Sequence, residues 1–372
     1  MSQLCRALSN QVIISCRNLI DLSILFEGRT RSSMKIFQEC IRCCSTYKSM
    51  YNKVKLTNDR TGDSQWNSDL KIILNSVDTF MERCQEMIEL CETMLIYGRL
   101  DETQDVPKPT FGFTRGAEFE KVCDKIEDLF HESFSKVEQV QDCILDVQSS
   151  DWYREMNRFR KDMKKIDTIA ENLILESFNM VKNVEEGLLT LQSLYEYSKR
   201  PSLFNVIEKK TAMVYKMFWD ELQEAKLSLL SEKNSYARLM PKYAGRAWTS
   251  LVKKTQLKSL YDLFQEKLWL PKVTIAVEIE SLYQDVIQTF DEAILSNYKR
   301  WLEVAESKIG VRLKRSLICR SLQKPGLLEV NIDRKLLYVF SEAKLWVDMG
   351  FPIPNEMSQL VARRNELTLL YR

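Results

Sequence analysis

The sequence is poor in the two residues that most often interrupt regular structure. It holds 10 glycines and 8 prolines among 372 residues, well under half their usual share in globular proteins. Because glycine is too flexible and proline too restricted for a helix interior, their scarcity favours long uninterrupted helices. Alternating strand patterns are also nearly absent. The sequence therefore predicts an all-α protein, an elongated stack of long antiparallel helices grouped in bundles.

An excess of charge of either sign is missing, and so is any long hydrophobic run. The 54 basic and 52 acidic residues leave a net charge of +2, so no global field favours nucleic acid, an anionic membrane or an acidic partner. Lys or Glu interrupts each apolar run before it reaches the roughly 18 residues that span a bilayer. We therefore expect no nucleic-acid partner and no membrane insertion.

Residues and motifs for catalysis are scarce as well. The single histidine, His131, lies in a helical pattern without a neighbouring Cys or Asp cluster. The sequence contains no P-loop, no Rossmann glycine motif, no H-E-x-x-H and no G-x-S-x-G. Its carboxylates are scattered over polar helix faces, with no pair placed as acid and base. We therefore expect no enzyme activity on this chain and no catalytic, cofactor-binding or metal-binding residue.

The sequence contains ten cysteines, and we expect them to lie in a reducing compartment. The start of the sequence lacks the basic and apolar segments of a signal peptide, so free thiols are expected rather than disulfides. Cys40, Cys43 and Cys44 form one metal-like cluster. A zinc site needs four ligands, and no second cysteine pair or histidine lies at a fitting distance. Packing of these thiols inside a helical bundle is the better interpretation.

Apolar residues at helical spacing are abundant. Two stripes follow the spacing of a helix that packs along another helix. The first comprises Leu70, Ile73, Val77, Phe80, Cys84, Met87, Cys91 and Met94. The second comprises Trp152, Met156, Phe159, Met163, Ile166, Ala170 and Leu173. We call them the first and second seams. Each is expected to pack either within this chain or on a partner, and the pattern leaves both options open.

The second seam begins after Ser149-Ser150-Asp151, which is typical of a helix cap. Beyond Leu173 the apolar pattern continues less regularly to Pro201. If unbroken, it predicts a single helical rod on the order of 70 Å long, with a bend at Gly187.

Turn and linker signals divide the chain into five segments. They are an N-terminal helical bundle segment (1–97), a linker with Pro107 and Pro109 (98–116), a long helical hairpin (117–200), a further helical bundle (201–330) and C-terminal helices (331–372). The stretch around Pro241 and Gly245 is expected to be looser, with a helix resuming near Thr249.

Basic residues cluster on the helix of the second seam and again near position 315. The first cluster comprises Arg154, Arg158, Arg160, Lys161, Lys164 and Lys165, and the second Arg312, Lys314, Arg315 and Arg320. The first would suit an acidic surface such as that of a microtubule, or nucleic acid. Because acidic residues are interleaved with it, a solvated, salt-bridged helix face is the better interpretation.

The C-terminal part of the sequence resembles a known family. Residues 326–354 read GLLEVNIDRKLLYVFSEAKLWVDMGFPIP. This segment is similar to the tail of dynein heavy chains, where a Val-Asn-Phe-Asp element leads into a helix with a Glu-x-Lys-x-Leu core and a Gly-x-x-Ile-Pro turn. The matching residues are Val330, Asn331, Asp333, Leu337, Glu342, Lys344, Leu345, Gly350, Ile353 and Pro354. Ile332 departs from the family's usual aromatic residue.

Shorter matches precede this segment, and the resemblance covers about residues 121–372. They include Trp301 in Tyr-Lys-Arg-Trp, and Gly245 and Trp248 in a stretch that begins at Pro241. For the family-like positions we expect architectural roles. Gly350 and Pro354 end one helix and aim the next, Asn331 and Asp333 cap a helix, and Trp248 and Trp301 are buried anchors. The axonemal members of the family are more similar than the cytoplasmic ones.

The resemblance implies a non-catalytic tail segment of an axonemal dynein heavy chain. In that family the tail assembles heavy chains with intermediate and light chains and anchors the motor to doublet microtubules. It implies a cytoplasmic, cytoskeletal location in the axoneme of a cilium or flagellum. Because the chain ends far short of the family's linker, ATPase ring, stalk and microtubule-binding region, we expect a fragment or short isoform. The alternative is a generic helical-rod scaffold or tether of the cytoskeleton or of membrane trafficking.

Overall fold

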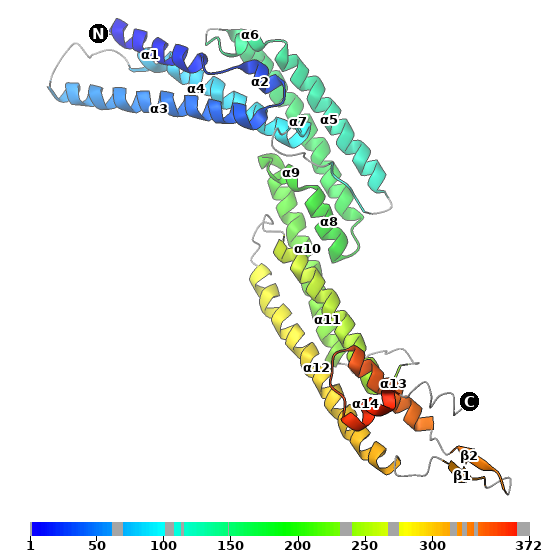
Figure 1. Ribbon diagram of the computed structural model, residues 1–372. Helices are drawn as coiled ribbons and strands as arrows, with labels where there is room; N and C mark the ends of the chain where they lie inside the picture. Colours follow the sequence, from blue (N-terminus) through cyan, green and yellow to red (C-terminus); the bar gives the residue numbers. More distant parts are fainter. Residues whose placement is uncertain are drawn as a thin grey trace. The chain divides into compact units, whose positions relative to one another are not determined.

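The protein divides into two compact units, residues Met1–Lys210 and Thr211–Arg372. Apart from one short hairpin and the connecting turns, the described residues are helical (Figure 1), so the predicted all-α class is confirmed. The five segments expected from the sequence stay a prediction. The computed structural model describes residues 2–61, 70–100, 108–112, 115–147, 149–230, 240–266, 275–312, 318–321, 326–330 and 334–362.

The first unit is a series of helices joined by short turns. In chain order they are α1 (Ser2–Arg17), α2 (Leu22–Phe26), α3 (Thr30–Thr61), α4 (Leu70–Thr93), a π-helical turn η2 (Met94–Gly98), α5 (Gly116–Glu138), α6 (Gln141–Ile144), α7 (Ser150–Asn179), α8 (Val184–Ser193), α9 (Tyr195–Ser198) and the start of α10 (Pro201–Leu230).

Helices α1, α3 and α4 form a bundle in which α3 and α4 run antiparallel (Figure 1). Tyr51 of α3 packs with Ile73 and Leu74 at the start of α4, in a small core that also holds Cys5 of α1. The hydroxyl of Ser9 links the three helices, because it lies 3.0 Å from the Tyr47 hydroxyl and donates to the Ile73 carbonyl over 3.4 Å. The apolar faces of α1, α3 and α4 therefore pack against one another in this core.

The π-helical turn η2 ends α4 where the chain must leave the bundle. Arg99, which follows it, has φ +52°, a left-handed conformation that is uncommon for any residue except glycine. A Cβ atom on Gly98 would come within 2.7 Å of the Phe130 ring of α5. The glycine thus lets α5 approach the end of α4 closely.

Helix α7 pairs with α5, and its boundaries differ from the single rod that the sequence predicts. As expected, Ser149 caps its start by accepting a hydrogen bond from the Asp151 amide. Helix α7 then ends at Asn179, so the expectation of one rod to Pro201 is wrong. Asn183 is extended (φ −139°) and caps α8 by accepting from the Glu186 amide over 2.8 Å. Because this local cap starts a new helix, α7 does not continue into α8. Gly187, where the sequence predicts a bend, lies buried inside α8.

The second unit is built on an antiparallel pair, α11 (Lys242–Glu266) and α12 (Ile275–Arg312), together with the end of α10. Tyr261 and Tyr283 stack at 3.9 Å between ring centroids, and Lys254 pairs with Asp291. The remaining elements are β1 (Ile318–Arg320), β2 (Leu328–Val330), α13 (Arg334–Asp348) and α14 (Asn355–Ala362). The two strands pair antiparallel with Cys319 opposite Glu329.

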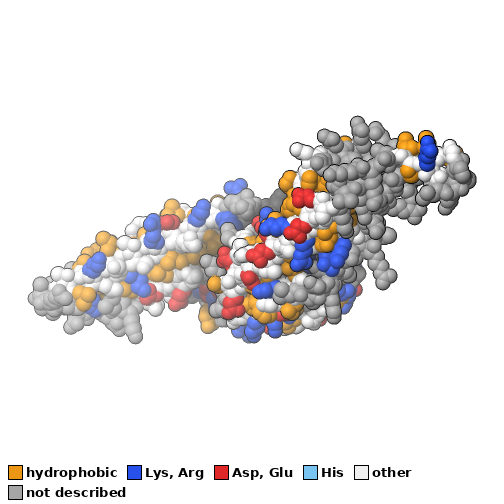
Figure 2. Space-filling view, turned by 90° about the horizontal axis from the view of Figure 1, so that it is seen from below, with side chains coloured by type: hydrophobic (Ala, Val, Ile, Leu, Met, Phe, Trp, Pro, Cys, Tyr) orange, Lys and Arg blue, Asp and Glu red, His pale blue; other side chains and the backbone are white. Residues whose placement is uncertain are grey.

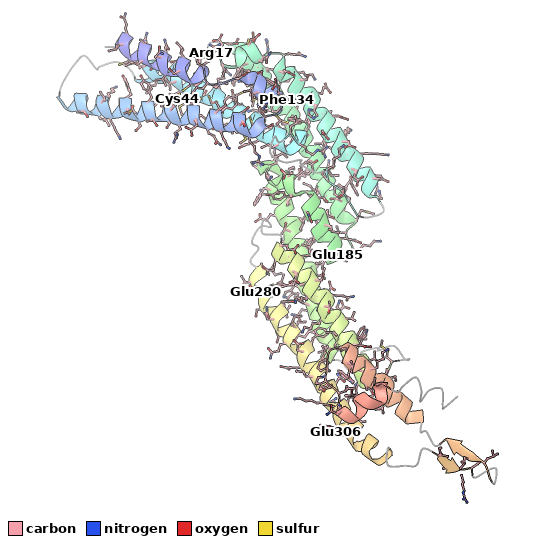
Figure 3. All side chains as sticks on the ribbon, in the orientation of Figure 1. Arg17, Cys44, Phe134, Glu185, Glu280 and Glu306 are labelled. Atoms are coloured by element: carbon pink, nitrogen blue, oxygen red, sulfur yellow. The ribbon has the colours of Figure 1, made fainter. Side chains whose placement is uncertain are left out.

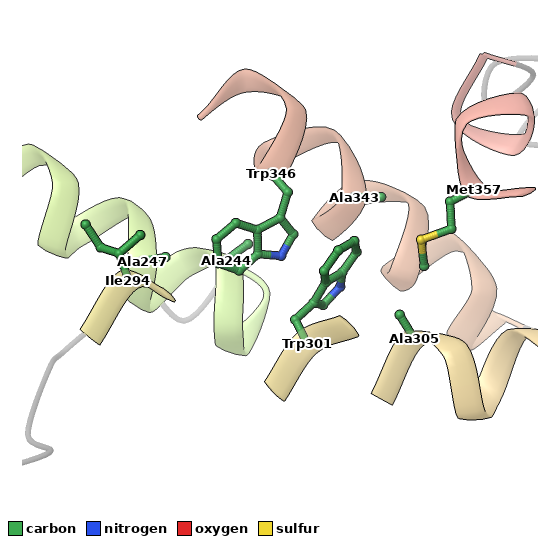
Figure 4. Close-up of a cluster of buried hydrophobic side chains, with 8 residues drawn as sticks. All are labelled: Ala244, Ala247, Ile294, Trp301, Ala305, Ala343, Trp346 and Met357. Carbon is green, nitrogen blue, oxygen red and sulfur yellow. The ribbon is translucent and has the colours of Figure 1, made fainter. Parts of the chain in front are cut away.

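A core of small and aromatic side chains joins α11, α12, α13 and α14 (Figure 4). The rings of Trp301 and Trp346 lie 5.7 Å apart between centroids, and Tyr298 and Phe351 pack beside them. Alanines on the neighbouring helices leave room for these large rings. The buried members are Ala244, Ala247, Ile294, Trp301, Ala305, Ala343, Trp346 and Met357.

Helix α11 starts earlier than the sequence predicts. The stretch after Pro241 is helical from Lys242, so the expectation of a loose segment up to Thr249 is wrong. The Glu342 carboxylate of α13 accepts hydrogen bonds from the backbone amides of Tyr243 and Ala244 at 2.9 and 3.0 Å. A carboxylate at a helix N-terminus satisfies free amides and complements the helix dipole, and this one comes from a distant part of the sequence.

Candidate functional site

The first seam is buried inside the first unit, on α4 and the first residue of η2, with α1 and α3 packed against α4. Its described side chains expose at most 2% of their surface, from Ile73 to Met94. The α4 helix begins at Leu70, whose side chain lies outside the described residues. The buried members are Ile73, Val77, Phe80, Cys84, Met87, Cys91 and Met94. The seam therefore packs on helices of the same unit.

The second seam is buried on α7, mainly against α5. The rings of Phe130 and Phe159 meet edge to face at 6.5 Å between centroids. The buried members are Trp152, Met156, Phe159, Met163, Ile166, Ala170 and Leu173. Trp152 also donates its indole N–H to Glu86 of α4 over 2.6 Å, which ties the second seam to the helix that carries the first.

Charged side chains bridge α4 and α7 beside the seams. Arg160 of α7 donates to Glu89 at 2.8 and 3.1 Å and to Glu86 at 3.4 Å. Elsewhere along α7 the predicted salt-bridged face is confirmed by ion pairs of Arg154 with Asp151, Arg158 with Glu155 and Lys165 with Asp162. Exposed ion pairs such as Arg154 with Asp151 contribute little to stability, whereas Arg160 joins α7 to α4.

A polar junction lies where η2, α7, α9 and the start of α10 meet. The Asp167 carboxylate accepts from the Tyr97 hydroxyl at 2.5 Å, from Arg200 through two N–H groups at 2.9 and 3.1 Å, and from the Ser202 hydroxyl at 2.9 Å. The side chains of Asp167 and Arg200 are about 85% buried. Burial, followed by the hydrogen bond to Asp167, raises the pKa of Tyr97, so the hydroxyl keeps its proton.

A small hollow, open to solvent, adjoins this junction. It is lined by Ile96, Tyr97, Arg99, Pro109, Cys123, Ser193, Glu196 and Tyr197. Arg99 forms an ion pair with Glu127 of α5, and Ser193 donates to the Thr110 carbonyl over 2.6 Å. Polar groups of the hollow are thus bound to neighbouring residues outside its lining, an arrangement typical of a structural junction.

Groups that could carry chemistry are dispersed. His131 lies at the surface of α5, with Nε2 4.0 Å from a Glu127 oxygen. Among the described residues, no group of three or more His, Cys, Asp or Glu is arranged to hold a metal ion. Within the same residues, every helix is too short or too polar to cross a membrane.

The cysteine cluster of α3 packs against α1 and α4. Cys16, Cys40, Cys44 and Cys84 are buried, whereas Cys43 is exposed; Figure 3 labels Cys44 on α3. The Cys40 thiol approaches the Cys16 carbonyl at 3.7 Å. Burial, with a further contribution from Cys16, raises the pKa of Cys40 and Cys44 to about 12. All ten thiols are free, as the sequence predicts.

These surroundings predict selective alkylation. The thiolate is the reactive form, so iodoacetamide at pH 8 should modify the exposed Cys43 and Cys319 at least about a hundredfold faster than Cys40 and Cys44. Mass spectrometry of tryptic peptides measures the rates, and the same reaction in denaturant should remove the difference. Equal rates in the folded chain would contradict the buried packing of these thiols.

Comparison with known proteins gives the family. The family described as dynein heavy chain, N-terminal region 1, matches residues 1–372, which is the whole chain. The chain belongs to this dynein heavy-chain family. The chain is 24% identical to the dynein-1-beta heavy chain of the flagellar inner arm I1 complex of Chlamydomonas reinhardtii, over 100% of its own length and 8% of that protein.

Further relatives in the dynein heavy-chain family are also axonemal or ciliary. Identity is 27% to dynein axonemal heavy chain 2 of Mus musculus, over 76% of this chain and 6% of the relative. It is 20% to the ciliary dynein beta chain of Heliocidaris crassispina, over 92% of this chain and 8% of the relative. The chain thus spans less than a tenth of these relatives. The predicted family and the axonemal location, in the cytoskeleton of a cilium or flagellum, are confirmed.

Two of the dynein-like positions of the second unit, Gly245 and Trp301, lie in its core. Trp301 is buried in the aromatic cluster, and Gly245 is buried on α11, where its amide donates to the Pro241 carbonyl over 2.8 Å. Trp248, on the same helix, is half-buried. These residues help α11 pack closely, which is a structural role.

Two more dynein-like positions form the turn between α13 and α14. Gly350 has φ +82°, and the Phe351 amide after it donates to the Trp346 carbonyl over 2.9 Å. Pro354 then accepts from the Met357 and Ser358 amides at the start of α14. The left-handed glycine ends one helix and redirects the chain into the next. Asn331 and Asp333, for which the sequence predicts a capping role, lie outside the described residues.

Sequence reasoning missed the Asp167–Arg200 junction and the Glu342 cap. Asp167 is one acidic residue among several on α7, and nothing in its local pattern distinguishes it. Its partners lie 33 and 70 positions away. Glu342 belongs to the family-like segment 326–354, for which the sequence predicts no cap at the start of α11. Both interactions depend on tertiary contacts that a periodicity analysis does not detect.

Proposed function

We propose that this chain is a non-catalytic tail segment of an axonemal dynein heavy chain, which assembles heavy chains with intermediate and light chains. Through that assembly it anchors the microtubule motor in a cilium or flagellum. The observation that carries the proposal is the match of the whole chain to the N-terminal region of dynein heavy chains. The generic rod scaffold, which periodicity alone would allow, does not account for that match.

The packing of the first unit supports an assembly role on the outer faces of the helices. Because both seams are buried within the unit, partner chains would bind side chains that the bundles leave exposed. Large apolar side chains of this kind occur in both units. They include Leu4, Leu8, Met50 and Val54 in the first, and Leu227, Val277 and Leu295 in the second. Figure 2 shows such hydrophobic side chains interrupting a surface of mixed charge.

We also propose that this segment carries no cofactor and hydrolyses no nucleotide. Its polar clusters are ion pairs and hydrogen bonds between helices, as at Asp167 and Arg200. Incubation of the purified chain with ATP should give no phosphate release above a blank and no tight binding of labelled nucleotide. Turnover that persists through further purification and is lost on heat denaturation would overturn this part of the proposal.

The assembly role is tested by affinity purification of the tagged chain from ciliated cells. Dynein heavy, intermediate and light chains should be recovered with it, and an unrelated helical rod with the same tag should recover none. Recovery of cytoskeletal or membrane-trafficking proteins without dynein subunits would favour the generic tether and overturn the tail assignment.

A further inference from the structure

Exposed apolar side chains occupy one flank of α1 and one flank of α3. Leu4 and Leu8 of α1 are 58% and 50% exposed, and Met50 and Val54 of α3 are 63% and 46% exposed. Each pair is spaced by four residues, which places its two members one above the other on the helix surface. We call these four residues the α1–α3 face.

Contacts between the helices show that the two pairs border each other. Leu4 and Leu8 directly precede Cys5 and Ser9, which contact α3: the Tyr47 hydroxyl donates to the Cys5 carbonyl over 3.3 Å and lies 3.0 Å from the Ser9 hydroxyl. At 100° per residue, Leu4 and Leu8 therefore lie on the same side of α1, next to the residues of α1 that contact α3.

The other flank of α3 is taken by α4. Lys48 of α3 pairs with Asp78 of α4, so α4 lies on the flank of α3 that carries Lys48. Met50 and Val54 stand on the opposite flank, together with Tyr47, which contacts α1. Two exposed apolar pairs on adjoining antiparallel helices make a surface of the kind that the apolar stripe of a third helix covers.

The charge around this face indicates which helix would fit. Residues 2–57 hold nine Lys and Arg side chains against three Asp and Glu. One of the three acids, Glu39, is paired with Arg42. Lys35 and Lys53 are exposed on α3 and lie about 60° from Met50 around that helix. Helix α4 has the opposite balance, with two basic and five acidic residues, and its Glu86 and Glu89 are bound to Arg160.

This excess of positive charge argues against a second copy of the chain as the occupant. A symmetric pair would bring two α1–α3 faces of the same sign together, and like charges across an interface oppose association. An acidic helix would instead gain from the surrounding Lys and Arg side chains while its apolar stripe covers the four exposed side chains.

We propose that the α1–α3 face binds an acidic amphipathic helix of a partner chain in the assembled dynein. The inference rests on the proposed tail function and names the chemistry of one of its partners. Apolar contacts with Leu8 and Met50 supply affinity, and the basic surroundings select acidic over basic helices and accelerate association.

The test uses the full 372-residue chain and a fluorescent helical peptide of Leu, Ala and Glu, with Leu at positions spaced three and four residues apart. Fluorescence anisotropy should detect binding that weakens as salt is added. The same peptide with Lys in place of Glu should bind at least about tenfold more weakly.

Three variants locate the binding. Leu8→Glu and Met50→Glu should each weaken binding of the Glu peptide at least about tenfold. Leu56→Glu adds the same charge to α3 at a side chain of matched exposure, 60%, on another side of the helix, and should leave binding within about twofold of wild type. Circular dichroism and thermal unfolding should be unchanged in all three, because each site is exposed.

Several outcomes would overturn the inference. They are equal binding of the Glu and Lys peptides, equal effects of Met50→Glu and Leu56→Glu, or self-association of the wild-type chain that Leu8→Glu abolishes without peptide binding. Failure of the peptide to bind, combined with continued recovery of dynein subunits by the tagged chain, would remove this docking site and leave the tail assignment intact. Loss of both would count against the two proposals together.

Discussion

Replacing Val77 by Asp should unfold the bundle of α1, α3 and α4. Val77 is fully buried on the first seam. A carboxylate at this position would be charged without a partner in an apolar core, at a cost of about 3–5 kcal/mol in the free energy of unfolding. Urea denaturation followed by circular dichroism measures the loss, and reduced helicity before urea is added would be its extreme form.

The matched control is Val54→Asp, which introduces the same side chain at a valine 46% exposed on α3. Because water solvates that carboxylate, the free energy of unfolding should change by no more than about 0.5 kcal/mol. If Val77→Asp and Val54→Asp had equal effects, the first seam would not be packed inside the unit.

Asp167→Ala should destabilise the first unit by about 3–5 kcal/mol, because it removes the shared acceptor of the polar junction. The Arg200 guanidinium would then be a largely buried charge without its counter-charge, and the Tyr97 hydroxyl would lose its acceptor. Asp167→Asn, which keeps a hydrogen-bond acceptor but removes the charge, should cost less. Thermal or urea unfolding of the wild type, Asp167→Ala and Asp167→Asn gives the order of their stabilities.

A neighbouring aspartate provides the comparison for this variant. Asp162 lies on the same helix and pairs with Lys165, whose side chain is 75% exposed, so Asp162→Ala should cost less than about 1 kcal/mol. Combining Asp167→Ala with Arg200→Leu should cost less than the two single changes together, because the second change removes the unpaired charge. Strict additivity would mean that Asp167 and Arg200 do not interact.

Periodicity in the sequence was sufficient to predict the helical class and the position of both seams. A stripe such as Trp152, Met156, Phe159 repeats a physical requirement at every turn, because each residue must leave water on the same side of its helix. Local caps were also predictable where a single side chain acts on its own backbone, as Ser149 does at the start of α7.

The break between α7 and α8 was harder to predict because the apolar pattern persists across it. The Asn183 side chain accepts a hydrogen bond from the Glu186 amide, so a new helix starts there instead of α7 continuing. Many asparagines occur inside or at the edge of helices, so the residue alone does not reveal the break. Only the extended conformation at position 183 shows which alternative is adopted.

Contacts between distant segments account for the remaining differences. Helix α11 begins at Lys242 although Pro241 and Gly245 suggest a loop, because Glu342 caps it and small residues pack it against α13. Asp167 binds partners from two other parts of the sequence, Tyr97 in η2 and the neighbouring Arg200 and Ser202. Sequence patterns describe each helix by itself, whereas these interactions exist only after the helices have packed.

The most direct test of this account is amide hydrogen exchange in the purified chain without partners. If the two seams are buried by packing inside the first unit, the amides of α4 and α7 around Val77 and Ile166 should be among the most protected from exchange in that unit. Those on the exposed side of α1 near Leu4 should exchange faster. Rapid exchange along both α4 and α7, with protection gained only when dynein partners are added, would contradict it.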